Sequence, residues 1–236
     1  MDRGVLYLVG TPVGNLSDFT PRGVETLKAA GIIAAEDTRH SRQLLDHYGI
    51  RPQRLEAYHS HNLSKRTAPL VKSLLEGISV ALISDAGSPG ISDPGAVLVR
   101  AAVEAGITVC PIPGPSAVVL AVTASGFPSH RFVFEGFLPR KKGRKRIIGS
   151  WKEEERTVVF FESGVRIVKT LEEMADILGP ERQVCAAREI TKKFEEFLRG
   201  RLDNVIGELK GRGSVKGEFT LVLAPEGFGL DHRQEE

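Results

Sequence analysis

Short apolar runs alternate with helical stretches through the first half of the chain, and this alternation restricts the fold more than any other feature. Five runs are expected to form strands, at residues 5–9, 32–35, 55–59, 79–84 and 108–112. Each is followed by a polar loop and then by a stretch with helical spacing, and several of those stretches end at a glycine. Near-continuous apolar strands joined by helical crossovers predict a mainly parallel sheet covered by helices on both faces.

A second α/β unit is expected after the segment GFPSH at 126–130, which has the composition of a hinge. We therefore predict two domains, at residues 1–127 and 128–236. In the second domain, strands are expected at 132–137, 158–162, 184–187 and 219–223, with helices around 164–178 and 202–209. The fold class is α/β in both domains.

Composition favours a cytoplasmic globular protein. Hydrophobic residues make up 41% of the chain and charged residues 26%, which is enough apolar material for packed cores. No apolar run approaches the roughly 18–20 residues that span a bilayer, so no membrane association is expected. The two cysteines, Cys110 and Cys185, lie in apolar runs and fit buried positions in a reducing compartment.

Two dipeptides predict helix starts, with an N-cap followed by proline at the first helical position. These are Thr20-Pro21 and Asp93-Pro94. Asp37 or Thr38 is a third possible N-cap, for the helix after the second strand.

Glycine and proline are concentrated in three loops that follow expected strands, at 10–14, 85–95 and 113–117. Glycine lets backbone approach a ligand closely, and N–H groups at helix starts bind anionic groups. Turn residues are ordinary in any single α/β loop, but three such loops at strand ends favour a shared ligand site at the carboxyl edge of the sheet. The first loop, GTPVG, matches neither the dinucleotide nor the P-loop pattern.

A metal site has no support in the sequence. His59 and His61 are two residues apart, without cysteines or carboxylates at ligand spacing. Each is more typical of a polar loop residue, although one could contact a substrate.

A run of positive charge occupies residues 140–146, RKKGRKR, with six basic residues in seven. The net charge of the whole chain is only +2, so this concentration stands out. Charge runs are often solvated surface, but this one has a single sign, contains a glycine and follows a proline. It predicts a mobile loop that contacts nucleic-acid phosphates through Arg140, Lys141, Lys142, Arg144, Lys145 and Arg146.

Several motifs, taken in order, resemble those of the tetrapyrrole methylase superfamily. They are GTPVGNLSD (10–18), EDTR (36–39), SDAGSPGISDPG (84–95) and PGPSA (113–117). The segments FEGFLPRKKGRKR (134–146), REITKKFEEFLRG (188–200) and KGEFTLVLAP (216–225) are similar to the branch that methylates small-subunit ribosomal RNA. One departure follows Phe161-Glu162-Ser163, where the family usually has Pro-His-Arg and this chain has Gly164-Val165-Arg166.

The resemblance implies two α/β domains with S-adenosyl-L-methionine in the cleft between them. It further implies 2′-O-methylation of a cytidine ribose in 16S rRNA of the 30S subunit, carried out by a homodimer. The residues that match the family's cofactor contacts are Gly10, Pro12, Gly14, Asp85, Gly87, Ser88, Pro89, Ile91, Ser116, Ala117, Phe161 and Ala187.

Methyl transfer to a ribose oxygen is an in-line displacement, so positioning supplies most of the catalysis and a general base assists. The candidates for that base are Glu36, Asp37 and Asp85. For Glu36 and Asp37 the alternative is a role at the start of the following helix. Arg39 is expected to hold an RNA phosphate or to pair with these carboxylates. His59, His61 and Arg66 are weaker candidates for lining the RNA side.

Two other function classes remain open at this point. A small-molecule methylase of the tetrapyrrole type would share the fold and cofactor without needing the basic run at 140–146. A non-catalytic RNA-binding assembly factor would keep that run without needing intact cofactor loops. Because all three glycine-rich loops are present, the sequence favours an enzyme.

Overall fold

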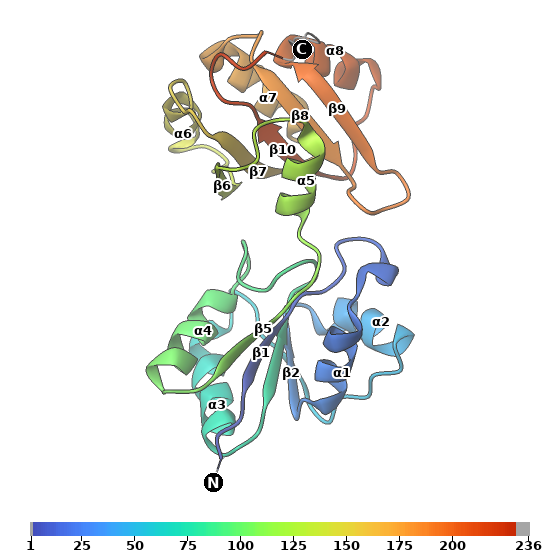
Figure 1. The fold of residues 1–236 in the computed structure, drawn as a ribbon, viewed down its shortest axis with the longest axis vertical. Coiled ribbons are helices and arrows are strands. Elements are labelled where there is room, and N and C mark those ends of the chain that lie inside the picture. Colours follow the sequence, from blue (N-terminus) through green and yellow to red (C-terminus); the bar gives the residue numbers. More distant parts are fainter. Residues whose placement is uncertain (1, 230–236) are drawn as a thin grey trace, which may run out of the picture. The chain divides into compact units, whose positions relative to one another are not determined.

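The computed structural model describes residues 2–229 and consists of two compact units that divide between Ser116 and Ala117. The sequence predicted the boundary eleven residues later, at 127. The difference arises from helix α5 (Ala117–Ser125), whose buried residues Val118, Ala121 and Val122 pack against strands of the second unit. That packing assigns the helix to the second unit (Figure 1).

The first unit is built on an all-parallel sheet of five strands in the order β3-β2-β4-β1-β5. Its strands are β1 (Leu6–Val9), β2 (Ile32–Ala35), β3 (Leu55–Ala57), β4 (Val80–Ile83) and β5 (Val109–Ile112). Every residue of the neighbouring strands β2 and β4 is buried, as the continuous apolar runs predicted.

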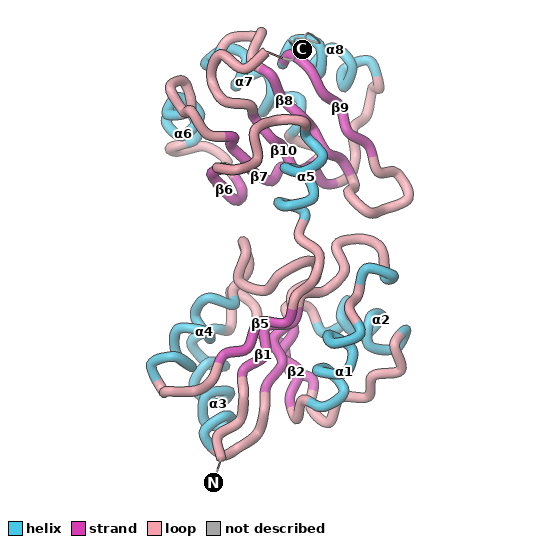
Figure 2. The backbone as a smooth tube through the Cα atoms, in the orientation of Figure 1, coloured by secondary structure: helices cyan, strands magenta, loops and turns pink. Residues whose placement is uncertain are grey.

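Helices cover both faces of this sheet (Figures 1 and 2). One face packs against α1 (Pro21–Ala29) and α2 (Thr38–His47), and the other against α3 (Leu63–Leu75) and α4 (Gly95–Glu104). A short 3-10 turn, η1 (Leu16–Asp18), lies between β1 and α1. The predicted doubly covered α/β fold is confirmed for this unit.

The helix starts agree with the sequence in two places and differ in a third. Thr20 caps α1 by accepting the N–H of Gly23, and Asp37 caps α2 by accepting the N–H groups of Arg39 and His40. The prediction for α4 was wrong, because Pro94 is its N-cap and makes no side-chain capping bond. Asp93 instead lies beside Ser84, at the end of β4, where the two residues line the same small pocket.

The second unit is a mixed sheet in the order β6-β7-β10-β8-β9, in which only β6 and β7 run parallel. Its strands are β6 (Phe132–Phe137), β7 (Thr157–Ser163), β8 (Gln183–Arg188), β9 (Glu196–Arg201) and β10 (Glu218–Leu223). Helix α5 packs on one face; α6 (Arg144–Ser150), α7 (Ile167–Leu178) and α8 (Leu202–Gly211) pack on the other.

Two elements of this unit were not predicted. Strand β9 carries three charged residues in six and buries only Leu198, so it lacks the apolar character of the other strands. Helix α6 occupies part of the basic run, which the sequence analysis treated as a mobile loop. Its apolar residue Ile148 is completely buried, and this packing explains why the segment is helical.

Within residues 2–229, no helix combines the length and the apolar character needed to cross a membrane.

Candidate functional site

The loops that follow the five parallel strands of the first unit all emerge at the carboxyl edge of its sheet. Two of them are joined by backbone bonds between Thr11, after β1, and Gly87, after β4. The N–H of Thr11 donates to Gly87 O at 2.9 Å and the N–H of Gly87 to Thr11 O at 3.0 Å. The Thr11 hydroxyl also donates to Ser84 O at 3.1 Å. Gly87 has a φ of +77°, which favours glycine.

The loops after β1 and β5 meet through two glycines. A Cβ on Gly114 would lie 2.7 Å from the carbonyl carbon and Cα of Gly10, and a Cβ on Gly10 would lie 2.8 Å from Gly114 Cα. Neither position therefore accepts a side chain. Together with the Thr11–Gly87 bonds, this contact makes the three glycine-rich loops one connected backbone surface, as the sequence predicted only in outline.

Carboxylates gather beside this surface, at the ends of β2 and β4. Partial burial raises the pKa of Glu36, and the nearby charge of Asp85 raises it further. Burial, with the charge of Glu36, raises the pKa of Asp93 to about 6. Glu36 and Asp93 also line a small pocket together with Tyr58 and Ser84. Asp93 was not among the predicted site residues, because the dipeptide Asp93-Pro94 was interpreted as a helix start.

Asp37 has a structural use in addition to any chemical one. Its carboxylate accepts N–H bonds from Arg39 at 2.8 Å and His40 at 3.4 Å, and the first of these is the main reason its pKa is lowered. Its own N–H donates to Asp85 Oδ1 at 3.2 Å, linking the β2 and β4 loops. Arg39 is 3.6 Å from Asp37, with its side chain 92% exposed.

The two histidines lie close together after β3, with ring centroids 6.0 Å apart. The backbone N–H of His59 donates to Asn62 Oδ1 at 3.0 Å. The ring atom His59 Nδ1 is buried and has no hydrogen-bond partner among residues 2–229. Arg66, on α3, is 3.8 Å from Glu56. No group of three or more His, Cys, Asp or Glu side chains in residues 2–229 is arranged to hold a metal ion.

The structure brings the predicted cofactor residues of the first unit to this one edge. Gly10, Pro12 and Gly87 are buried, whereas Gly14 and Asp85 are exposed. Ile91 presents an exposed apolar side chain, 47% accessible, on the β4 loop. Half-buried positions are held by Ser88, Pro89, Ser116 and, at the start of the second unit, Ala117.

The remaining two predicted cofactor residues lie in one row of the second sheet. Phe161 on β7 and Ala187 on β8 both pair with Thr220 on β10, which stands between them. Directly opposed residues of antiparallel strands point to the same face, so the three side chains share the face that α5 covers. Thr220 is buried and polar, and its place within an apolar strand gave no sequence signal of a site.

The basic run divides into two groups. Arg140, Lys141, Lys142, Lys145 and Arg146 are exposed, and none forms an ion pair with a carboxylate in the described part of the chain. Arg144 differs: only 7% of its side chain is accessible, and its guanidinium contacts Glu162, Glu173 and Thr170. The predicted RNA contact by Arg144 is therefore corrected to an internal role.

Glu162, at the end of β7, is the centre of that internal network and is fully buried. It lies 2.6 Å from Arg166 and 3.5 Å from Arg144, and it accepts the Thr170 hydroxyl at 2.7 Å. Buried charges are stable only when paired and hydrogen-bonded, a condition that this set meets. The network ties the start of α6 to β7 and α7.

Gly164, where the family usually has proline, fits a tight site. Its N–H donates to Gly217 O at 2.7 Å, and a Cβ would lie 2.7 Å from the Lys216 carbonyl carbon. Proline would lose that bond and meet that backbone. Val165, in the place of the usual histidine, is 93% exposed.

Solved structures share this two-unit fold. The methyltransferase CobJ superposes with a TM-score of 0.70 over 100% of this chain and 98% of its own, at 19% identity. A cobalamin biosynthetic enzyme, cobalt precorrin-4 methyltransferase, gives a TM-score of 0.64 over 93% of this chain and 94% of its own, at 16% identity. The chain therefore has the same two-unit α/β fold as these two proteins.

The family follows from sequence. Residues 5–206 match the model of tetrapyrrole (corrin/porphyrin) methylases, and the chain belongs to that family. It is 49% identical, over 94% of its length and 79% of the relative's, to "Ribosomal RNA small subunit methyltransferase I" of Synechocystis. Proteins of the same name are 48% identical in Halalkalibacterium halodurans (100% and 80% covered) and 46% identical in Thermotoga maritima (94% and 98%). The predicted family is confirmed.

The first-unit edge suits the methyl donor expected of this family. S-adenosylmethionine carries a positive sulfonium and a positive ammonium group, and the edge carries Glu36, Asp37, Asp85 and Asp93. The close approach of Gly10 and Gly114 leaves main-chain groups as the binding surface. Ile91 adds an exposed apolar side chain to this edge. The negative charge and the small residues of this edge fit such a cofactor.

Proposed function

We propose that this chain is an S-adenosylmethionine-dependent methyltransferase that methylates the ribose 2′-oxygen of a cytidine in 16S rRNA. The observation that carries the proposal is similarity at 46–49% identity, over almost the whole chain, to proteins named ribosomal RNA small subunit methyltransferase I. We further propose that it acts in the cytoplasm on the assembled 30S subunit, as a homodimer.

S-adenosylmethionine, when bound, supplies a methyl carbon already activated by its sulfonium. The loops at 10–14 and 85–91, with Ser116, would hold the cofactor mainly through backbone groups. In the second unit, Ala117, Phe161 and Ala187 are assigned to the same role. Holding oxygen, carbon and sulfur in line is the main catalytic task of these residues.

Glu36 is the best candidate for general base. The raised pKa of its carboxyl brings it closer to the pH at which it must accept a proton, and a better-matched base is more effective. Asp85 adds negative charge beside Glu36, which raises the pKa of Glu36 further. Asp37 is the least suitable of the three, because its carboxylate already caps α2.

The exposed cations of the basic run support RNA as the substrate. Arg140, Lys141, Lys142, Lys145 and Arg146 lack carboxylate partners within residues 2–229, so they are available for phosphates. Arg39, on the first unit, is assigned to the RNA side for the same reason of exposure. A methylase of small tetrapyrroles has no need of such a cluster.

Transfer of tritiated methyl groups to purified, unmethylated 30S subunits tests the proposal. We expect label on the ribose of one 16S cytidine, located by nuclease mapping, and less or none on free rRNA. A tetrapyrrole that accepts label when 30S subunits and free rRNA do not would replace the proposal with the small-molecule function. Binding of RNA without any transfer would leave an assembly factor.

A further inference from the structure

An open pocket lies at the carboxyl ends of the parallel strands β6 and β7. It has a volume of about 550 Å³. Its lining consists of the last residue of β6, Phe137, with residues 138–140, and of the last residue of β7, Ser163, with Val165 and Arg166. None of the cofactor residues assigned above lines it. A volume of this size is in the range of small-molecule sites and accommodates one nucleotide.

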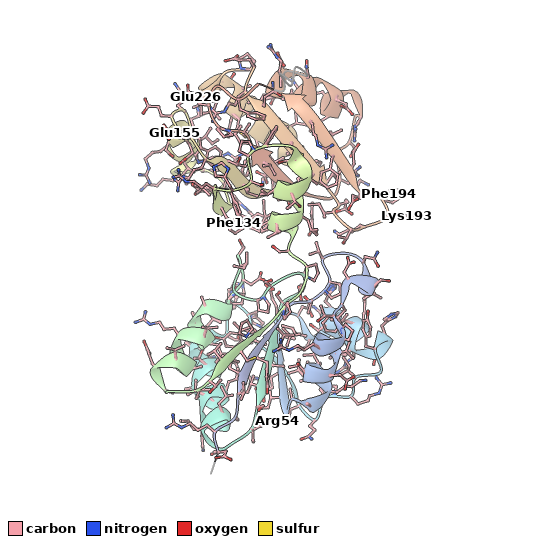
Figure 3. The ribbon with its side chains drawn as sticks, viewed as in Figure 1. Arg54, Phe134, Glu155, Lys193, Phe194 and Glu226 are labelled. Atoms are coloured by element: carbon pink, nitrogen blue, oxygen red, sulfur yellow. The ribbon has the colours of Figure 1, made fainter. Side chains whose placement is uncertain are left out.

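Phe137 gives the pocket an aromatic surface that is fixed in place and still accessible. Its side chain is 59% exposed, and its ring centroid is 5.3 Å from that of Phe161. Phe161 in turn packs against Phe134 on β6, with 5.1 Å between the ring centroids. Phe134 is labelled in Figure 3. A supported ring with a free surface is the kind of platform on which nucleic-acid bases stack.

Arg166 gives the pocket a held positive charge. Its Nη2 lies 2.6 Å from the buried Glu162 carboxylate and its Nε donates to Ser163 Oγ at 3.3 Å. The side chain remains 32% exposed, and no hydrogen bond from its Nη1 is found within residues 2–229. A guanidinium fixed on one side and open on the other suits a phosphate.

Arg140 adds a second cation, exposed and without an ion pair in the described residues. The pocket thus combines an aromatic face with two arginines and carries no carboxylate among its lining residues. This combination matches a base with its phosphate. It does not match duplex RNA, in which bases are stacked inside the helix.

We propose that this pocket binds one unpaired nucleotide of the substrate RNA, with the base on Phe137 and the phosphate between Arg140 and Arg166. The inference rests on RNA being the substrate class, as proposed above. It gives an RNA-binding role to Phe137 and Arg166, which lie outside the basic run.

The test measures binding of two fluorescent probes to the full chain: a single-stranded hexacytidylate, and a ribose-phosphate hexamer that lacks bases. Phe137→Leu keeps apolar bulk and removes the aromatic face. We expect it to weaken hexacytidylate binding about tenfold and to leave the baseless hexamer unchanged. The matched control is Phe194→Leu, on the β8–β9 loop, where the ring is 65% exposed (Figure 3). We expect no change there.

Arg140→Ala should weaken both probes and lower the salt slope by about 0.7, the value for one phosphate on a single strand. Affinity for S-adenosylmethionine is measured for each variant, because Phe137 contacts Phe161. The proposal is overturned if Phe137→Leu leaves hexacytidylate binding intact, if Phe194→Leu weakens it equally, or if cofactor affinity falls in parallel. Should Phe137→Leu not fold, ultraviolet cross-linking of wild-type protein to hexacytidylate decides, with Phe137 or a neighbouring pocket residue as the expected site.

Methyl transfer to 30S subunits by the wild type separates the two proposals. If the wild type transfers methyl groups and Phe137→Leu binds hexacytidylate as tightly as the wild type, the pocket assignment is wrong and the methyltransferase function stands. If Phe137→Leu selectively loses hexacytidylate binding and the wild type transfers no methyl group, the pocket assignment stands and the methyltransferase function is wrong.

Discussion

The two units place opposite charges at the ends of their parallel strands. In the first unit, β2 and β4 end in Glu36, Asp37 and Asp85, with Asp93 nearby. In the second unit, the segments after β6 and β7 carry the basic run and Arg166. The same architectural position therefore offers a site for a cation in one unit and for an anion in the other.

The units also differ in how they hold those charges. Glu36, Asp85 and Asp93 of the first unit form no ion pair with an arginine within residues 2–229. Burial and then the charge of neighbouring carboxylates raise the pKa values of Glu36 and Asp93. In the second unit, Arg144 pairs with the buried Glu162 and with Glu173, and Arg166 shares Glu162 while remaining partly exposed. The neighbouring cations of the basic run are exposed and form no ion pair within residues 2–229. A run of one sign thus separates into an internal anchor and an external surface, and the two groups should respond differently to mutation.

Arg144→Met is expected to have the largest effect on stability. It leaves Glu162 with less positive charge in a buried setting, so the free energy of unfolding should fall by about 3 kcal/mol. Lys145→Met is the control, one residue further along α6 and exposed, and it should change stability by less than about 0.5 kcal/mol. Denaturant unfolding measures both. Equal effects at the two positions would contradict the division of the basic run into anchor and surface.

Gly114→Ala should be next in size and should act on the first unit. The new methyl group would lie 2.7 Å from Gly10 backbone atoms, so the loops after β1 and β5 must separate. We expect a loss of about 2 kcal/mol in stability and a drop of at least tenfold in cofactor affinity. Gly207→Ala, inside α8 with no atom within 4 Å of the new Cβ, should gain about 0.5–1 kcal/mol. Unchanged cofactor binding in Gly114→Ala would disconnect these loops from the cofactor site.

The double variant Lys145→Ala/Arg146→Ala tests the external group. RNA affinity should fall about tenfold at constant salt, and the salt slope should decrease by about 1.5, while the unfolding midpoint stays the same. Lys152→Ala/Lys169→Ala is the matched control, with two exposed lysines of the same unit. Titrations of 16S rRNA fragments at several salt concentrations provide the measurement. A similar loss in the control would mean that RNA senses only the total charge.

The first unit was predictable because each of its strands is a separate apolar run. The buried strands β2 and β4 and the capped starts of α1 and α2 are set by local sequence. The loops at 10–14 and 113–117 could be identified as a site, but their contact through Gly10 and Gly114 depends on strand order, which no local pattern specifies.

The second unit was harder to predict because long-range contacts decide its features. The edge strand β9 is defined by pairing with β8 rather than by its own composition. Arg144 cannot be told from Lys145 by sequence; its burial depends on Glu162, Thr170 and Glu173 from other elements. Asp93 presents the same problem in the first unit, where contact with Ser84 replaced the expected cap.

Asp93→Asn should give the smallest effect, one that depends on pH. The pKa of Asp93 is raised to about 6 by burial and by Glu36, above the ordinary value of 3.8, so the folded state binds this proton more tightly than the unfolded state. Ionisation of Asp93 therefore opposes folding, and the wild type loses stability as pH rises through about 6. Asparagine removes that loss. Because the side chain keeps some contact with water, we expect Asp93→Asn to be more stable than wild type by about 1 kcal/mol at pH 8.

The gain should shrink towards zero near pH 4. Denaturant midpoints of both proteins between pH 4 and pH 8 measure it. A gain that is constant with pH would mean that the pKa of Asp93 is not raised in the folded state. The contrast between the carboxylate edge of the first unit and the arginine-paired edge of the second would then fail.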